Sequence, residues 1–357
     1  MEKKPFVRIA KRENASYLSA WLIRLLAFVL ALILGGIVFM CAGADPISAY
    51  KTIIEGSLGK AHRIRQTIKV AIPLLGTAVA LAPCFRMKYW NCGAEGQITM
   101  GAVGASFFAI YFGAKWPSIM LLPIMGLAGI AFGALWSLLP AIFKARWGTN
   151  ETLFTLMLNY IAIGIVAWLQ GGPWEGMPGS QIIPTFKESA VLPSVLGVHC
   201  GWIMVLILMF FMYFYLNFTK HGYEVAVLGE SENTARYAGM KVRTIILRTA
   251  LLSGAISGLV GFMVCSGTDQ TLFANVANGV GFTAITIAWL SQLNPFAMLI
   301  ISMMLAILSK GSSALQSSLS VPASVSGIMT GILLMTLLGC EFFINYRLIF
   351  NFKKEVL

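Results

Sequence analysis

Long apolar segments recur along this chain of 357 residues. A helix that crosses a bilayer needs about 20 mainly apolar residues, because each residue rises about 1.5 Å and the hydrocarbon layer is about 30 Å thick. A segment in lipid must satisfy its own backbone hydrogen bonds, so each is expected to be helical. Ten segments approach or exceed the required length: residues 20–42, 67–85, 95–113, 118–143, 152–170, 201–218, 248–267, 279–292, 295–309 and 325–349. The sequence therefore predicts an all-α polytopic membrane protein with about 10 transmembrane helices, or 8 to 9 if the short eighth and ninth segments do not both cross.

The composition excludes an ordinary soluble domain. The chain is 58% hydrophobic and 11% charged, with a mean hydropathy of +0.79, whereas soluble domains are roughly a quarter charged. The first 16 residues are polar and basic, and no small-residue cleavage site follows the first apolar segment, so we expect that segment to be an anchor and not a cleaved signal peptide. The six cysteines are scattered without a CxxC motif, which predicts neither a metal site nor a disulfide framework.

The distribution of basic residues predicts the orientation of the chain. A net charge of +12 is also found in nucleic-acid-binding proteins, but in a chain with many spans Lys and Arg gather in cytoplasmic loops, so no nucleic-acid partner is expected. With the N-terminus inside, 17 of the 26 basic residues fall in inner segments and 8 in outer ones. Both termini are therefore expected in the cytoplasm. The positive charges at residues 51–69 oppose this topology unless they belong to an amphipathic segment on the membrane surface.

Residues 1–357 are expected to form a single transmembrane domain. Three segments lie outside the predicted helices and are long or polar enough to have their own role. Residues 1–19 are expected to be a cytoplasmic N-terminal segment, residues 171–200 an external loop and residues 219–247 a cytoplasmic loop. The external loop is rich in Gly and Pro, which leaves a docking surface and a simple covering loop as alternatives.

The second to fifth and the seventh to tenth predicted helices run in opposite orientations under this topology, which is the inverted-repeat plan of many transporters. Each half contains one interrupted segment, residues 83–96 in the first half and residues 279–295 in the second. Such interruptions free backbone groups, which a membrane tolerates only where they line a cavity or contact protein. These two segments are therefore expected to line a cavity or to contact protein.

Polar side chains cluster at the first interruption, in the sequence NCGAEGQITMGA at residues 91–102. A charged side chain in the centre of a membrane costs about 2.5–3.5 kcal/mol on insertion scales, so it usually faces a cavity or a partner group. Glu95 is expected either to compensate a helix dipole and accept backbone N–H bonds or to contact a solute, and the first alternative is favoured. The candidates for a substrate pathway are Asn91, Glu95, Gln97, Phe107, Tyr111 and Asn159. The simpler interpretation of Asn159 is a bond to a neighbouring helix. The simpler interpretation of the aromatic residues is a position that faces lipid or the protein core.

The cytoplasmic loop contains signals for a short helix. Ser231 is a good N-cap, Glu232 follows where the helix dipole favours an anion, and Gly239 fits the left-handed position after a helix end. A helix over residues 232–238 is too short to be stable alone in water, so it must dock on another surface. Its exposed residues are expected to include Ala235, Tyr237 and Ala238. They suit a helix in the groove of another protein, and packing on the chain's own inner face is the alternative.

Four blocks of the sequence together resemble the permease subunits of bacterial ABC importers of the nucleoside and simple-sugar type, the basic-membrane-protein-associated systems. The blocks are NCGAEGQITMGA (91–102), NETLFTLMLNYIA (150–162), GESENTARYAGMKV (229–242) and GVGFTAITIAWLSQLNPFAM (279–298). The chain departs from the usual pattern at Cys92, Thr234 and residues 289–292. These departures affect the detail of the substrate and leave the family resemblance intact.

The resemblance implies a transmembrane permease in a bacterial plasma membrane that moves nucleosides, or related simple sugars, into the cytoplasm by alternating access. It implies three protein partners besides membrane lipid: an ABC ATPase, a second permease that forms a heterodimer with this one, and an extracellular substrate-binding lipoprotein. The chain is expected to bind no cofactor and to be no enzyme, with ATP and Mg used by the ATPase. The residues expected to couple this chain to the ATPase are Gly229, Glu230, Ser231, Asn233, Ala235, Tyr237, Ala238 and Gly239.

Other classes fit the sequence less well. GSLGKAH at residues 56–62 lacks the glycine spacing and the Ser or Thr of a P-loop, so the energy must come from a partner. An ion-coupled secondary transporter remains the alternative, and it needs ionisable groups within its helices. Glu95 is nearly the only candidate. An intramembrane enzyme would need a nucleophile with its base or a metal cluster, and the sequence shows no such pattern.

Overall fold

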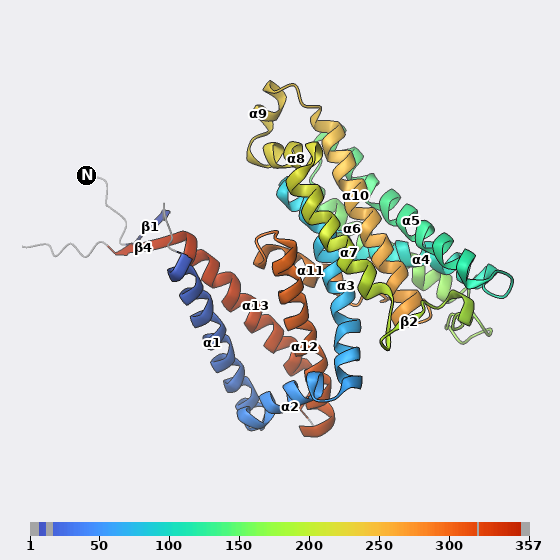
Figure 1. Ribbon diagram of the computed structural model, residues 1–357, viewed down its shortest axis with the longest axis horizontal. Coiled ribbons are helices and arrows are strands. Elements are labelled where there is room, and N and C mark those ends of the chain that lie inside the picture. Colours follow the sequence, from blue (N-terminus) through green and yellow to red (C-terminus); the bar gives the residue numbers. More distant parts are fainter. Residues whose placement is uncertain (1–6, 12–16, 320, 351–357) are drawn as a thin grey trace, which may run out of the picture. The chain divides into compact units, whose positions relative to one another are not determined.

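A computed structural model describes residues 7–11, 17–319 and 321–350 (Figure 1). The chain divides into two compact units, one formed by Met1–Lys60 with Ile307–Leu357 and the other by Ala61–Ala306. Most of the predicted cytoplasmic segment 1–19 lies outside the described residues.

The larger unit is a bundle of helices with one short two-stranded sheet. Its elements are α3 (Ala61–Arg86), α4 (Ala94–Phe112), α5 (Ser118–Trp147), α6 (Glu151–Gln170), η1 (Glu188–Ala190), β2 (Ser194–Val195), β3 (Val198–His199), α7 (Gly201–Phe218), α8 (Lys220–Glu230), α9 (Glu232–Tyr237), α10 (Val242–Met263), the π-helical turn η2 (Val264–Thr268), α11 (Val280–Leu290) and α12 (Pro295–Leu319), which continues past the end of the unit. The strands β2 and β3 form an antiparallel hairpin within the predicted external loop.

The smaller unit contains α1 (Tyr17–Cys41), α2 (Pro46–Leu58), α13 (Ala323–Asn345) and the strands β1 (Val7–Lys11) and β4 (Tyr346–Phe350). The chain bends by 108° between α1 and α2, where the Asp45 carboxylate caps α2 by accepting the Ser48 N–H at 2.8 Å. α1 packs against α13, and β1 pairs antiparallel with β4. The first and last described segments of the chain therefore lie side by side.

Each of the ten predicted segments coincides with a helix. In chain order, these helices are α1, α3, α4, α5, α6, α7, α10, α11, α12 and α13. Among the described residues, six helices are by themselves long and apolar enough to cross a membrane, and a seventh candidate is the bent pair formed by part of α1 with α2. The eleven residues of α11 extend only about 16 Å, roughly half of the hydrocarbon layer. The prediction of a short ninth helix was wrong, because α12 continues to Leu319. Among the described helices, α11 is therefore the clearest element that does not cross.

α4 is the central helix of the larger unit. It contacts α5, α6, α10 and α11, and every residue from Ala94 to Ser106 is buried. Helices rather than lipid surround this part of α4, so its polar side chains can be satisfied by protein groups. This explains how a helix that begins with Glu95 and Gln97 lies inside a membrane protein.

α5 and α10 run side by side in the closest helix pair of the unit (Figure 1). Gly129 and Gly133 of α5 face Gly254 and Gly258 of α10, and a Cβ atom on Gly258 would overlap the carbonyl oxygen of Gly129. Small residues four apart allow two backbones to approach closely, which replaces the hydrophobic driving force that lipid does not provide. Gly254 and Gly258 are thus helix-packing residues.

A single methyl group at this contact should loosen the bundle. Gly258→Ala overpacks the α5–α10 contact, and overpacking typically costs about 1–3 kcal/mol. The matched control is Gly164→Ala on α6, where nothing lies within 4 Å of the new Cβ atom and the change removes the entropic cost of a helical glycine. We expect Gly258→Ala alone to lower the thermal unfolding temperature of the detergent-solubilised protein. Equal unfolding temperatures for the two variants would contradict the packing described here.

Candidate transport pathway and coupling site

The two interrupted segments meet at Glu95. Its carboxylate accepts the backbone N–H of Gly279 at 2.7 Å through Oε1 and that of Gly281 at 2.7 Å through Oε2. Gly279 is the N-cap of α11 and has a φ of +76°, a left-handed conformation that favours glycine. Glu95 therefore accepts backbone N–H bonds at a helix start, as predicted, but these bonds come from α11 in the second half of the chain, while Glu95 itself lies in the first turn of α4.

Two side-chain amides stabilise the non-helical turn before α4. Asn91 Oδ1 accepts the Gly93 N–H at 3.0 Å and the Gln97 Nε2–H at 3.1 Å. Asn91 Nδ2 donates to Ser253 Oγ of α10 at 3.2 Å. These bonds attach the interrupted segment to a long neighbouring helix and fix its conformation.

Asn159 of α6 holds the same turn from the opposite side. Its Oδ1 accepts the Gly96 N–H at 2.8 Å, and its Nδ2 donates to the Cys92 carbonyl at 2.9 Å. Thr155, one turn earlier on α6, accepts the Cys92 N–H at 3.2 Å. Asn159 thus bonds to a neighbouring element, which was the favoured interpretation of its sequence position.

The structure brings four of the six predicted pathway residues into one cluster. Asn91, Glu95, Gln97 and Asn159 are each at most 3% exposed. A solute can reach these side chains only in another conformation of the protein. Their direct contact with a solute stays a prediction.

Phe107 and Tyr111 lie apart from that cluster. They are on the later turns of α4, with ring centroids 5.0 Å apart, and both are more than 40% exposed. Twelve residues of helix separate Phe107 from Glu95, which is about 18 Å along the axis. The aromatic pair and the polar cluster therefore do not form one binding site on this chain.

Two tryptophans form a second contact between the interrupted segments. Trp90 and Trp289 stack with ring centroids 5.2 Å apart and an interplanar angle of 18°, and Phe85 lies 5.7 Å from Trp289. Sequence reasoning missed this stack, although each tryptophan lies within one of the two interrupted segments and Trp289 departs from the family pattern. α11 is thus bonded at its start by Glu95 and packed at its end against Phe85 and Trp90, all from one short stretch of chain.

The predicted cytoplasmic loop, residues 219–247, folds into two helices. The predicted short helix is α9, one residue shorter than expected, with Ser231 Oγ accepting the Thr234 N–H at 3.3 Å and Gly239 at a φ of +74°. Glu232 and Arg236 form an ion pair at 2.6 Å on its exposed side. The prediction missed α8, whose signal was Thr219 as an N-cap that accepts the Gly222 N–H at 3.2 Å.

The prediction that Ala235 is exposed was wrong. Ala235 is completely buried in an apolar cluster with Cys84, Met87, Tyr89, Val225, Leu228, Val242 and Ile245. A helix of six residues has too few hydrogen bonds to be stable alone, and this anchor supplies the missing stabilisation. Gly229 is also buried, against the Arg86 carbonyl.

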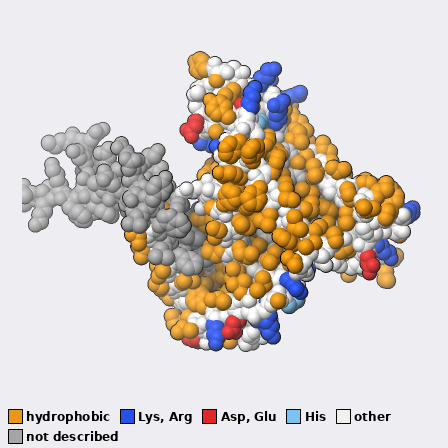
Figure 2. Space-filling model, viewed as in Figure 1, with side chains coloured by type: hydrophobic (Ala, Val, Ile, Leu, Met, Phe, Trp, Pro, Cys, Tyr) orange, Lys and Arg blue, Asp and Glu red, His pale blue; other side chains and the backbone are white. Residues whose placement is uncertain are grey.

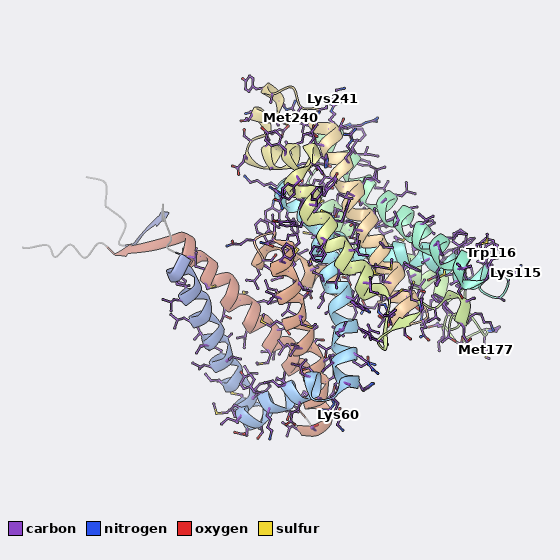
Figure 3. All side chains as sticks on the ribbon, viewed as in Figure 1. Lys60, Lys115, Trp116, Met177, Met240 and Lys241 are labelled. Atoms are coloured by element: carbon purple, nitrogen blue, oxygen red, sulfur yellow. The ribbon has the colours of Figure 1, made fainter. Side chains whose placement is uncertain are left out.

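The other predicted coupling residues remain on the surface around α9. Tyr237 is 93% exposed, and Glu230, Asn233, Ala238 and Gly239 are exposed beside it. In Figure 3, Met240 and Lys241 mark the connection from α9 to α10 at this end of the unit. α9 therefore packs on its own protein through Ala235 and presents Tyr237 outward, so both alternatives for the helix are compatible with the structure.

Comparison with known proteins supports the architecture at the level of the whole chain. Residues 63–338 match the family model described as the permease component of the branched-chain amino acid transport system. The chain belongs to this family. The permease is 30% identical to the glucose ABC transporter permease protein of Haloferax volcanii, over 92% of this chain and 90% of the relative.

Two relatives are associated with nucleosides. The guanosine ABC transporter permease protein of Bacillus subtilis is 29% identical to this permease, with coverage of 89% and 93% of the two chains. The nucleoside ABC transporter permease protein of Lactococcus lactis is 24% identical, with coverage of 87% and 88%. The predicted family resemblance is confirmed.

The loop at residues 171–200 of the permease is bonded to η2 and to the segment that follows it. The Leu192 N–H donates to the Ser266 carbonyl at 3.1 Å, and the Phe186 N–H to the Gln270 carbonyl at 2.8 Å. His199 of β3 is buried, with its Nε2 3.2 Å from Thr268 Oγ1. The loop is therefore an ordered cover on this end of the bundle.

Removing the Glu95 carboxylate should loosen the start of α11. Glu95→Ala leaves the buried N–H groups of Gly279 and Gly281 without their acceptor, at a cost of about 1–3 kcal/mol for each. The matched control is Glu175→Ala, which also removes an acceptor of a backbone N–H, that of Gln181, but at an exposed site. We expect faster proteolysis near Gly279 and a lower unfolding temperature for Glu95→Ala only. Similar behaviour of both variants would show that the bonds to α11 do not stabilise the fold.

Protonation of His199 should destabilise the loop at residues 171–200. Burial, with the nearby charge of Lys69, lowers the pKa of His199 from 6.5 to about 4. The unfolded chain therefore binds this proton at a higher pH than the folded chain, so the stabilisation is complete above about pH 6.5 and is lost as the pH falls toward 4. Burial raises the pKa of Asp269 to about 6, which acts in the opposite direction.

The measurement is the unfolding temperature at pH 7.5 and pH 5 for the wild type and for His199→Gln. Because Asp269 contributes equally to both proteins, the difference between them isolates the histidine. We expect the wild type to lose more stability on acidification than the variant. An equal or smaller loss in the wild type would contradict the buried neutral state of His199.

Proposed function

We propose that this permease imports a neutral polar solute, a nucleoside or a related simple sugar, by alternating access driven by ATP hydrolysis in a partner protein. Its ABC-type relatives for guanosine, nucleosides and glucose support the class of solute. The observation that carries the proposal is the bond between Glu95 and the start of α11.

The start of α11 is already bonded to the Glu95 carboxylate, which favours a solute without a negative charge. In many transporters the N-terminus of a broken helix points at an anionic group of the substrate, because its free N–H groups and its dipole attract negative charge. Here the Glu95 carboxylate already accepts the N–H groups of Gly279 and Gly281. A solute carboxylate or phosphate would meet a negative charge at this point. Nucleosides and sugars carry no such group, whereas amino acids do.

The energy is proposed to enter through α9. An exposed aromatic side chain on a short, anchored helix is suited to a groove in a partner protein, and Tyr237 has this position. The proposed partner is an ABC ATPase that uses ATP and Mg. A second permease and an extracellular substrate-binding lipoprotein complete the proposed importer, and this chain itself performs no covalent step.

The proposed location is the bacterial plasma membrane, with both termini in the cytoplasm. Two observations support this orientation. The inner segments hold 17 of the 26 basic residues, which is the bias of cytoplasmic loops. The pairing of β1 with β4 places the first and last described segments side by side, which favours the same side of the membrane for both.

An ion-coupled transporter is not favoured. Such a protein needs an ionisable side chain that is available to the driving ion. Glu95, the sequence candidate for this role, already has two backbone N–H partners. No specific observation on the described residues favours this second function.

The deciding experiment is transport by the complete importer in proteoliposomes. We expect ATP-dependent uptake that unlabelled guanosine or glucose inhibits and that leucine or a nucleotide does not. Inactivation of the partner ATPase should abolish the uptake. Uptake driven by an ion gradient alone would contradict the proposal, and so would inhibition only by leucine or the nucleotide, which carry a carboxylate or a phosphate.

Truncating Tyr237 should uncouple the importer without unfolding it. Tyr237→Ala removes a side chain that is 93% exposed and makes no core contact, so the unfolding temperature should not change. We expect weaker co-purification with the ATPase and at least a tenfold loss of ATP-dependent uptake, about the effect of losing one interface hot spot. The matched control is Tyr160→Ala on α6, which removes another strongly exposed tyrosine. Full uptake by Tyr237→Ala would refute the assignment of α9 as the coupling element.

A further inference from the structure

A basic cavity lies between the end of α5 and the connection from α9 to α10. Its volume is about 660 Å³, and its charged lining residues are Lys144, Arg146, Glu232, Arg236, Lys241 and Arg243. Figure 2 shows Lys and Arg side chains concentrated at this end of the larger unit, above a surface of mainly hydrophobic side chains. Five positive groups thus surround one hollow that has a single acidic lining residue.

Only part of this positive charge is neutralised within the protein. Lys144 pairs with the largely buried Glu151 at 2.7 Å, and Arg236 pairs with Glu232 at 2.6 Å. Arg146, Lys241 and Arg243 have no acidic partner in the part of the chain that the structure describes. The cavity therefore has an excess of three positive charges, which favours an anionic occupant.

The position of the cavity relative to the apolar surface indicates the source of the anion. Arg146 continues the α5 stripe formed by Leu135, Leu139 and Ile142, because residues at spacings of three and four lie on one face of a helix. Those three residues help to line an apolar groove of about 330 Å³. A phosphate at Arg146 thus lies at the end of a surface suited to a hydrocarbon chain.

An aromatic residue at the same level supports a membrane-interface position. Trp147 is 63% exposed, and the Arg146 guanidinium lies 6.0 Å from its ring centroid. Exposed tryptophans are enriched at the boundary between hydrocarbon and headgroups. The basic cavity therefore lies where the headgroups of membrane lipids are found, and a soluble phosphate would not use the apolar groove.

We propose that this cavity binds the phosphodiester headgroup of an anionic phospholipid, with one acyl chain along the apolar groove of α5. The bound phosphate connects Arg146 at the end of α5 with Lys241 and Arg243 at the start of α10. It thereby stabilises the connection that carries α9. Binding of the lipid does not depend on the transported solute, and only its consequence for coupling rests on the proposed function.

The test uses the full permease in nanodiscs of phosphatidylcholine containing phosphatidylglycerol. Lipids retained after detergent extraction are measured by native mass spectrometry. The test variant combines Arg146→Gln, Lys241→Gln and Arg243→Gln. The control combines Lys60→Gln, Lys115→Gln and Lys187→Gln, which removes the same charge from exposed positions outside the cavity.

The wild type and the control variant should retain phosphatidylglycerol in preference to phosphatidylcholine. The test variant should lose this preference by about tenfold or more, because each basic residue near an anionic headgroup contributes measurably to lipid binding. Equal retention by the test and control variants would overturn the proposal.

Two further arms separate other occupants from a lipid. Displacement of phosphatidylglycerol by millimolar inorganic phosphate would show that the site takes any soluble phosphate and would overturn the lipid assignment. If the test variant keeps phosphatidylglycerol but no longer co-purifies with the ATPase, the cavity receives an acidic surface of that partner, which also overturns the proposal. Failure to transport nucleosides leaves the lipid result unaffected, so the two proposals can fail separately.

Discussion

The bond between the Glu95 carboxylate and the first N–H groups of α11 is the interaction on which the centre of the bundle depends. α11 has eleven residues and cannot cross the membrane, so its start lies within protein, where unpaired N–H groups are costly. One carboxylate satisfies two of them at 2.7 Å and also compensates the helix dipole. The same stretch of chain packs on the end of α11 through Phe85 and Trp90.

The remaining polar groups of the centre follow the same constraint. Asn91, Gln97 and Asn159 bond to the turn before α4 or to each other, and α4 is enclosed by other helices. The glycine contact between α5 and α10 brings these long helices close enough to complete that enclosure. A polar cluster that is fully satisfied by protein is rigid, so the proposed contact with a solute requires the surrounding helices to move. This is the physical basis for proposing the cluster as part of an alternating-access pathway.

At the loop of residues 219–247, local and non-local information can be separated. The cap at Ser231 and the left-handed Gly239 were predictable, because capping depends on residues within one turn. The burial of Ala235 was not, because it depends on Val225, Tyr89 and Val242 from three other segments. α8 was missed for a related reason, since its residues Val225 and Leu228 become a buried face only against residues of other segments, such as Met87 and Ile245. The exposed Tyr237 was predicted correctly and has no such dependence.

The sequence by itself determined where the apolar helices lie and which polar residues are unusual, because bilayer thickness sets helix length and lipid excludes unsatisfied polar groups. Only the tertiary structure decided which of these residues meet. Glu95 bonds to residues 184 and 186 positions away, and Trp90 stacks on Trp289 from the other interruption. Helical periodicity fixes which residues share a face of one helix. Which other helix packs against that face depends on the arrangement of many helices, and no local pattern encodes this arrangement.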